Sequence, residues 1–323
     1  MKRLFYQHGA LLIGLTPVMV YCLSCLLFEA NDDTALQVKK LLLANISKTA
    51  PTAAMVMQEY KARILWQCSS LLSICAYFAA MAWSCSLFYR CCQSGAQSKT
   101  IIVMGLAIVS LTVLQMVQAD AGSALYIGIY RTTYDALGAS PLIADDFHRQ
   151  VYLVINLINL LAAMAPVFIL VAVCGTFSIA DHHGEPDLQL IAERQDYLKQ
   201  GVAAGSIVLL FGIIHMVAWL QWPKALMGEN SSFAKVFANY SHANSQFWGL
   251  TFTLLLLSIY FAATLALQIR MKDTLESMPE SPAKQKWLMT NNFTVNIQKH
   301  AFQLGMMLMP SLAGSLDSVI ELM

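Results

Sequence analysis

Charged residues are scarce in this sequence. Asp, Glu, Lys and Arg make up 12% of the chain, about half of the roughly 25% found in soluble domains. Apolar residues reach 57%, and the mean hydropathy is +0.56. Because a water-exposed surface needs charge to be wetted, this shortage argues against an ordinary soluble protein and predicts that much of the surface faces lipid.

An excess of one charge sign is also absent. The chain carries 20 basic and 19 acidic residues, so its formal net charge is +1. A nucleic-acid-binding protein needs a basic patch to meet the phosphates. The near balance therefore argues against nucleic acid as a partner.

Several signatures of catalysis and cofactor binding are missing as well. The sequence has no Gly-rich phosphate loop, zinc-protease helix or nucleophile elbow. His215 is the only histidine in the middle of an apolar run, so a haem held between two helices would lack its second imidazole. Most of the eight cysteines lie inside apolar runs, where cysteine behaves as a small hydrophobe. We therefore expect no cofactor and no disulfide framework.

The sequence does contain six long apolar runs, at approximately residues 9–28, 64–89, 101–117, 151–177, 202–222 and 247–267. About 20 helical residues cross hydrocarbon roughly 30 Å thick. Only a helix can satisfy every backbone group within one such segment. The runs predict an all-α integral membrane protein with six transmembrane helices in a membrane domain over residues 1–271.

The connections between the runs alternate in length. Long polar segments follow the first, third and fifth runs, and they have helical patterns of their own at residues 34–43, 123–137 and 232–238. This alternation predicts three hairpins with the long loops on one face. Basic residues near the ends of the runs, such as Arg3, Arg90 and Arg270, favour a cytoplasmic N-terminus and C-terminus. We expect a multi-pass protein of the cell (inner or plasma) membrane.

The chain continues beyond the sixth run. Residues 272–288 contain Pro279 and Pro282 and are expected to form a polar linker. Residues 289–323 are amphipathic, and Pro310 is expected to divide their apolar stretch because proline disrupts a helix interior. The pattern predicts short C-terminal helices that lie in the membrane interface or dock on the bundle, with a re-entrant segment as the alternative.

Polar side chains within the apolar runs are the first candidates for a site, because each is costly to expose to lipid. Gln115 and Gln118 lie at the end of the third run, Asn156 and Asn159 share one helical face of the fourth, and His215 lies in the fifth. Together they predict an outer polar cluster that binds a small solute or ion, or responds to a proton. The alternative is that these side chains hydrogen-bond neighbouring helices to one another.

A second candidate site precedes the fourth run. Asp145, Asp146 and His148 are residue types that suit a divalent metal. Adjacent aspartates point about 100° apart on a helix, however. An acidic first turn stabilised by the helix dipole is the alternative. A third segment rich in possible ligands, residues 181–187, contains Gly184 and Pro186 and is expected to be a solvated loop.

Three functional classes follow from these observations. We expect first a non-catalytic membrane component, either a subunit, a scaffold or a sensor. A transporter or channel that uses the outer polar cluster is the first alternative, and a membrane-embedded metal-dependent enzyme is the second. The expected partners are the lipid bilayer and other membrane proteins or a second copy of the chain.

Overall fold

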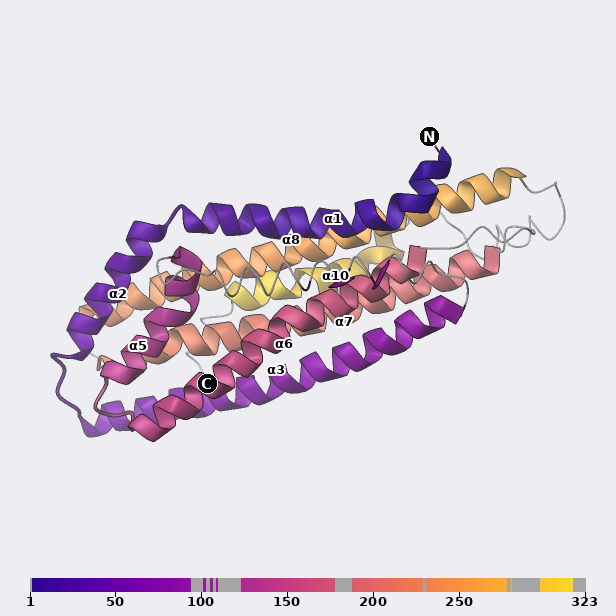
Figure 1. The fold of residues 1–323 in the computed structure, drawn as a ribbon. Helices are drawn as coiled ribbons and strands as arrows, with labels where there is room; N and C mark the ends of the chain where they lie inside the picture. The colour runs from indigo at the N-terminus through magenta and orange to yellow at the C-terminus, as the bar shows by residue number, and fades with distance from the viewer. Residues whose placement is uncertain are drawn as a thin grey trace.

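The computed structural model describes residues 2–93, 101–102, 105–106, 109, 123–177, 188–228, 231–277, 280 and 297–315. These residues form helices and their connections, and no strand occurs among them. The long helices lie side by side in an elongated bundle, and α2 and α5 gather at one of its ends (Figure 1). The all-α class predicted from the sequence is confirmed for this part of the chain.

Four of the described helices are long and apolar enough to cross a membrane, judged by length and composition. They are α3 (Ala53–Gln93), α6 (Asp145–Phe177), α7 (Leu188–Gln221) and α8 (Ser232–Ser277). At 1.5 Å per residue, the 41 residues of α3 and the 46 of α8 extend about 60–70 Å. That is about twice the hydrocarbon thickness, so these helices are longer than the apolar runs within them.

Two further predicted runs are described in part. α1 (Lys2–Glu29) packs along α8, with Phe28 against Trp248 at a ring-centroid distance of 5.5 Å. The third run is described only at residues 101–102, 105–106 and 109. There Gly105 lies so close to α6 that an added Cβ would come within 2.6 Å of Val171 Cγ2.

One end of the bundle is covered by short helices that we call the cap. The cap consists of α2 (Asp32–Ile46), the π-helix η1 (Tyr126–Arg131), α5 (Thr132–Ala139) and the 3₁₀ helix η2 (Trp222–Leu226). Helical structure was predicted for the long loops at 34–43 and 123–137, and α2, η1 and α5 agree with it. The helix expected at 232–238 forms the first turns of α8 and is not a separate element, because no Gly or Pro interrupts the chain directly after it.

The C-terminal helix corrects one prediction. α10 (Ile297–Ser315) continues through Pro310 as one helix and docks on α7 and α8, so the expected division at Pro310 is wrong. The neighbouring helix supplies the reason, because the backbone N–H of Ser311 donates to Thr253 Oγ1 of α8 at 3.2 Å. The backbone group loosened by the proline is therefore satisfied by tertiary contact.

α10 also packs closely against α8, in an antiparallel orientation. A Cβ on Gly249 would lie 2.6 Å from the Pro310 carbonyl, and a Cβ on Gly314 would lie 2.6 Å from the Ser245 carbonyl. These two approaches share one antiparallel register. Small residues at such crossings let two helix backbones meet. α10 thus lies alongside α8 (yellow beside orange in Figure 1), with its C-terminal end directed toward the cap.

Candidate functional site

A cluster of aromatic rings fills the place where the cap meets the bundle. Trp66 of α3 has ring-centroid distances of 6.1 Å to Trp219 of α7 and 5.1 Å to Trp222 of η2. Tyr130 of η1 stacks on Trp219 at 6.3 Å, and Phe147 of α6 packs edge-on against Trp222 at 6.2 Å. We call these five side chains the aromatic junction. They connect α3, η1, α6, α7 and η2, which are spread along the chain from residue 53 to residue 226.

His215 of α7 lies beside the aromatic junction, with its ring centroid 6.4 Å from that of Trp66. Its Nδ1 is 3.4 Å from the hydroxyls of both Ser69 and Ser70 on α3. Each hydroxyl donates its hydrogen to the carbonyl of Trp66, at 2.9 and 2.7 Å. Because a hydroxyl has only one hydrogen, we assign the donor role at Nδ1 to the imidazole. This assigns the proton to Nδ1 and leaves a lone pair on Nε2.

Three ring nitrogens in this region have no hydrogen-bond partner within the described part of the chain. They are Trp66 Nε1, Trp222 Nε1 and His215 Nε2. Their residues are 2%, 0% and 6% exposed. Trp219 differs, because its Nε1–H donates to the Ile129 carbonyl at 2.9 Å. A buried polar group without a hydrogen bond costs about 1–3 kcal/mol, so the region holds hydrogen-bonding capacity that these protein groups do not use.

α3 turns a column of small polar side chains toward α7. Ser69, Ser70 and Ser73 are buried, and Ser73 Oγ donates to the carbonyl of Phe211 at 3.0 Å. The hydroxyl of Tyr77 lies 3.1 Å from the position that a Cβ would take on Gly212. This column was not identified from the sequence, because isolated serines within an apolar run do not interrupt its hydrophobic pattern. The available signal was the recurrence of polar residues every three or four positions, which marks one helical face.

The π-helix η1 links the aromatic junction to the cap. In a π-helix the backbone hydrogen bonds join residues five apart, so the backbone is wider than in an α-helix. Here Thr132 Oγ1 donates to the Ile127 carbonyl at 2.7 Å, and the Ile129 carbonyl accepts the Trp219 indole. The position of Tyr130 is thus determined by contacts on both sides of it.

Glu29, at the end of α1, caps the start of the helical segment that leads into η1. Its carboxylate accepts hydrogen bonds from Ser123 Oγ at 2.9 Å, from the Ala124 N–H at 2.8 Å and from the Leu125 N–H at 3.2 Å. The first N–H groups of a helix lack intrahelical partners, and the helix N-terminus favours negative charge. Glu29 therefore fastens this segment to α1, although the two are 94 residues apart in sequence.

The predicted outer polar cluster is divided by the structure. Asn156 and Asn159 are exposed on α6, whereas His215 is buried. The hydrogen-bonding neighbours of His215 are the serines of α3 rather than the asparagines of α6. Gln115 and Gln118 lie outside the described residues, as does the predicted loop at 181–187.

The predicted metal residues have separate surroundings. Asp145 and Asp146 are exposed in the first turn of α6, and Asp146 pairs with Arg149 at 3.7 Å. His148 Nε2 lies 3.0 Å from the Tyr134 carbonyl, to which it donates, and the imidazole stacks on the Tyr134 ring at 4.1 Å. Within the described ranges, no group of three His, Cys, Asp or Glu residues could hold a metal ion.

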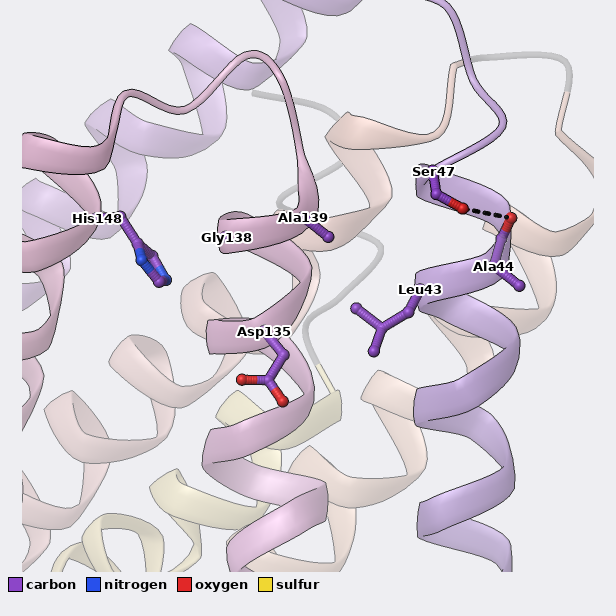
Figure 2. Close-up of a pocket in the computed structure, with 7 residues that line it drawn as sticks. All are labelled: Leu43, Ala44, Ser47, Asp135, Gly138, Ala139 and His148. Atoms are coloured by element: carbon purple, nitrogen blue, oxygen red, sulfur yellow. Dashed lines mark hydrogen bonds between the residues drawn. The ribbon is translucent and has the colours of Figure 1, made fainter.

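His148 borders an open depression of about 630 Å³ on the side of the cap (Figure 2). In this view α5 lies between His148 on one side and α2 on the other. Asp135 on α5 forms ion pairs with Lys39 at 2.7 Å and Arg131 at 3.1 Å. The acidic group is thus neutralised by the chain itself. The remaining wall is mainly apolar, formed by residues including Leu43 and Ala139.

A buried arginine organises the end of the bundle opposite the cap. Arg194 of α7 is 0% exposed, and its guanidinium donates to the carbonyls of Cys91 and Gly175, each at 3.0 Å. These carbonyls lie in the last turns of α3 and α6, where helix carbonyls lack intrahelical donors. The charged neighbours Glu193 and Asp196 are typical of a solvated helix, so the sequence does not reveal this role.

The first apolar run contains a Cys-x-x-Cys spacing, Cys22 and Cys25. Neither cysteine forms a disulfide; Cys22 is exposed and Cys25 is buried. Reactive pairs of this kind lie at helix N-termini, whereas these cysteines lie in the interior of α1. The spacing therefore adds no redox centre to the candidate site.

No protein-family model matches the sequence, and neither the curated proteins nor the solved structures contain a match. The function is accordingly inferred from the chain's own geometry.

Proposed function

We propose that this chain is a non-catalytic membrane component, a subunit, scaffold or sensor, that holds a folded cap on one side of the membrane. The observation that carries the proposal is that acidic groups of the cap region are committed to contacts within the chain. Glu29 caps the segment before η1, Asp135 joins α2 to α5, and Glu59 forms a bidentate pair with Arg63 at 2.9 Å. A catalytic group has to face a substrate, whereas these groups connect one helix turn or element to another.

The proposal includes a membrane topology. α1, α3, α6, α7 and α8 each run along the bundle (Figure 1), and Gly105 of the predicted third run lies against Val171 of α6. These five helices and this contact support the six crossings expected from hydropathy. The antiparallel register brings α10 level with residues 244–262 of α8, which covers most of the predicted crossing at 247–267. α10 is not among the four described helices that are apolar enough to cross a membrane by composition, but it packs on α7 and α8. We therefore propose α10 as a seventh crossing within the bundle, which replaces the cytoplasmic C-terminus expected from the sequence.

An odd number of crossings would place the two termini on opposite sides. With the cytoplasmic N-terminus favoured by Lys2 and Arg3, the cap and the C-terminal end would face the outside of the cell membrane. The test is a protease-cleavable tag at either terminus of the full chain in intact cells. External protease should remove the C-terminal tag and spare the N-terminal one. Equal protection of both tags would contradict the seventh crossing.

An exposed apolar patch supports a protein partner in addition to the bilayer. Val56, Met57 and Tyr60, in the first two turns of α3, are 48%, 68% and 58% exposed. All three precede the predicted crossing at 64–89, and Tyr60 lies between Glu59 and Arg63 in the sequence. Apolar patches outside the lipid are typical of protein–protein contacts. We propose that another membrane protein or a second copy of this chain covers the patch.

Site-specific photo-crosslinking tests this component function. A photoreactive amino acid at position 57 or 60, expressed in native membranes, should give a polypeptide adduct. Phe78, which is 54% exposed in the middle of α3, is the matched control and should give lipid adducts. Absence of a polypeptide adduct from both Met57 and Tyr60 would overturn the partner contact.

A transporter or channel is the second candidate, and the buried imidazole of His215 beside the serine column favours it. Intramembrane ionisable residues next to other polar groups mark many solute and proton paths. This candidate predicts that a solute raises the melting temperature of the purified chain and that His215→Ala abolishes the rise. The same solute should enter proteoliposomes that contain the wild-type chain. A polypeptide adduct at Met57 without any solute-dependent stabilisation would favour the component.

A further inference from the structure

We propose a buried binding site for one small neutral hydroxylic molecule, water or a short alcohol, between Trp66, Trp222 and His215. The site is independent of whether the chain acts as a component or as a transporter. It rests on three unpartnered ring nitrogens in one cluster of neighbouring rings: the Trp66 ring lies 5.1 Å from that of Trp222 and 6.4 Å from that of His215.

The three nitrogens are chemically complementary to a hydroxyl group. The indole nitrogens of Trp66 and Trp222 are donors only. His215 Nε2 is an acceptor, because the hydroxyls of Ser69 and Ser70 both donate to the Trp66 carbonyl and leave Nδ1 as the imidazole's donor. A guest that satisfies all three must accept hydrogen bonds and also donate one. Water and alcohols do both.

The surroundings of these rings disfavour a charged guest. The guanidinium of Arg63, whose Cζ lies 4.2 Å from the Phe147 centroid, is already paired with Glu59 at 2.9 Å. An anion would meet the lone pair of His215, and a cation would meet two indole N–H groups. An unpaired buried ion is far more costly than a neutral polar group. A single imidazole also falls short of the three or four ligands that hold a metal ion.

The number of polar groups suits a single small molecule. Buried waters in proteins make about three hydrogen bonds to groups that would otherwise be unsatisfied. Trp66, Trp222 and His215 offer three such bonds within one cluster of neighbouring rings. The neighbouring Trp219 has no such need, because its indole is bonded to Ile129. Trp219 is therefore an internal control of the same residue type, also 2% exposed.

Nuclear magnetic resonance of the full chain in lipid nanodiscs tests the site. The six tryptophans give six indole N–H signals, which single Trp→Phe variants assign. The Trp66 and Trp222 indoles should exchange hydrogen with water about tenfold faster than the Trp219 indole, which a protein hydrogen bond protects. Nitrogen-15 labelling of histidine should show the His215 proton on Nδ1. Exchange of Trp66 and Trp222 as slow as that of Trp219, or a proton on Nε2, would overturn the proposal.

The variant His215→Phe distinguishes a locally bound guest from a general opening of the fold. His215→Phe keeps a ring but removes the acceptor, so it should change the Trp66 indole signal and leave that of Trp219 unchanged. Equal changes at both indoles would contradict a local guest. If His215→Phe fails to fold, the wild-type proton position and exchange rates still decide the question. Titration with ethanol then separates the two guests: a saturable shift of the Trp66 signal identifies an alcohol site, and no shift identifies water.

Discussion

Replacement of Glu29 should loosen the cap from the bundle. Its carboxylate is the acceptor for a hydroxyl and two backbone N–H groups at the start of the segment that leads into η1. Glu29→Ala leaves all three donors without this partner. Glu29→Gln keeps one acceptor oxygen but turns an NH₂ group toward the same donors. The expected order of stability is wild type, then Glu29→Gln, then Glu29→Ala.

The magnitude follows from the contacts. Loss of a capping side chain typically costs about 1 kcal/mol and up to about 2. The negative charge at a helix N-terminus adds about 0.3–1 kcal/mol, or up to about 2 when partly buried. We expect Glu29→Ala to lower the free energy of unfolding by about 2–4 kcal/mol and Glu29→Gln by about 1–2 kcal/mol. Ser123→Ala should be non-additive with Glu29→Ala, because the two side chains share a hydrogen bond.

Equilibrium unfolding in mixed micelles, followed by tryptophan fluorescence, measures these differences. Glu276→Gln is the matched control, because its side chain is 65% exposed and its pair with Lys272 is long, at 3.8 Å. That control should change stability by less than about 0.5 kcal/mol. The reasoning would be refuted if Glu29→Ala were as stable as wild type, or if Glu29→Gln were indistinguishable from Glu276→Gln.

Three other predictions concern different parts of the fold. Gly249→Ala and Gly314→Ala should each lower the melting temperature, since their Cβ atoms would come within 2.6 Å of backbone carbonyls across the α8–α10 contact, whereas Gly305→Ala, with nothing within 4 Å, should not. Arg194→Met should lower the free energy of unfolding by about 2–4 kcal/mol, because it leaves two helix-end carbonyls without their donor; Arg149→Met, at a 79% exposed side chain, should change it little, and equal effects would contradict the capping role. Burial, followed by the charge of neighbouring Tyr126, raises the pKa of Tyr130 above its ordinary value. The folded state therefore keeps this hydroxyl neutral, and the free energy of unfolding falls as the pH rises above about 10, where the tyrosine of the unfolded chain ionises. The melting temperature should therefore fall less steeply between pH 9 and pH 11 in Tyr130→Phe than in wild type, and an unchanged slope would contradict this assignment.

The candidate site was only partly accessible to sequence reasoning. His215 stood out because it is a lone imidazole in an apolar run, and the structure does bury it among polar groups. Its partners Ser69 and Ser70 lie about 145 residues earlier in the chain. Nothing local distinguishes them from serines that bond their own helix. The expected neighbours Asn156 and Asn159 have the same residue chemistry but lie on an exposed face of α6.

Hydropathy alone determined that the chain forms long apolar helices, because burial of backbone polar groups in apolar surroundings leaves few alternatives to a helix. Loop composition was also enough to place helices at the cap. Which faces meet was decided only by tertiary structure, since α3 and α8 are apolar on nearly all sides and their pattern does not mark the contacting face. Tertiary contacts also decided that α10 continues through Pro310. A proline ends an isolated helix, but the hydroxyl of Thr253 and the open backbone at Gly249 allow this one to continue.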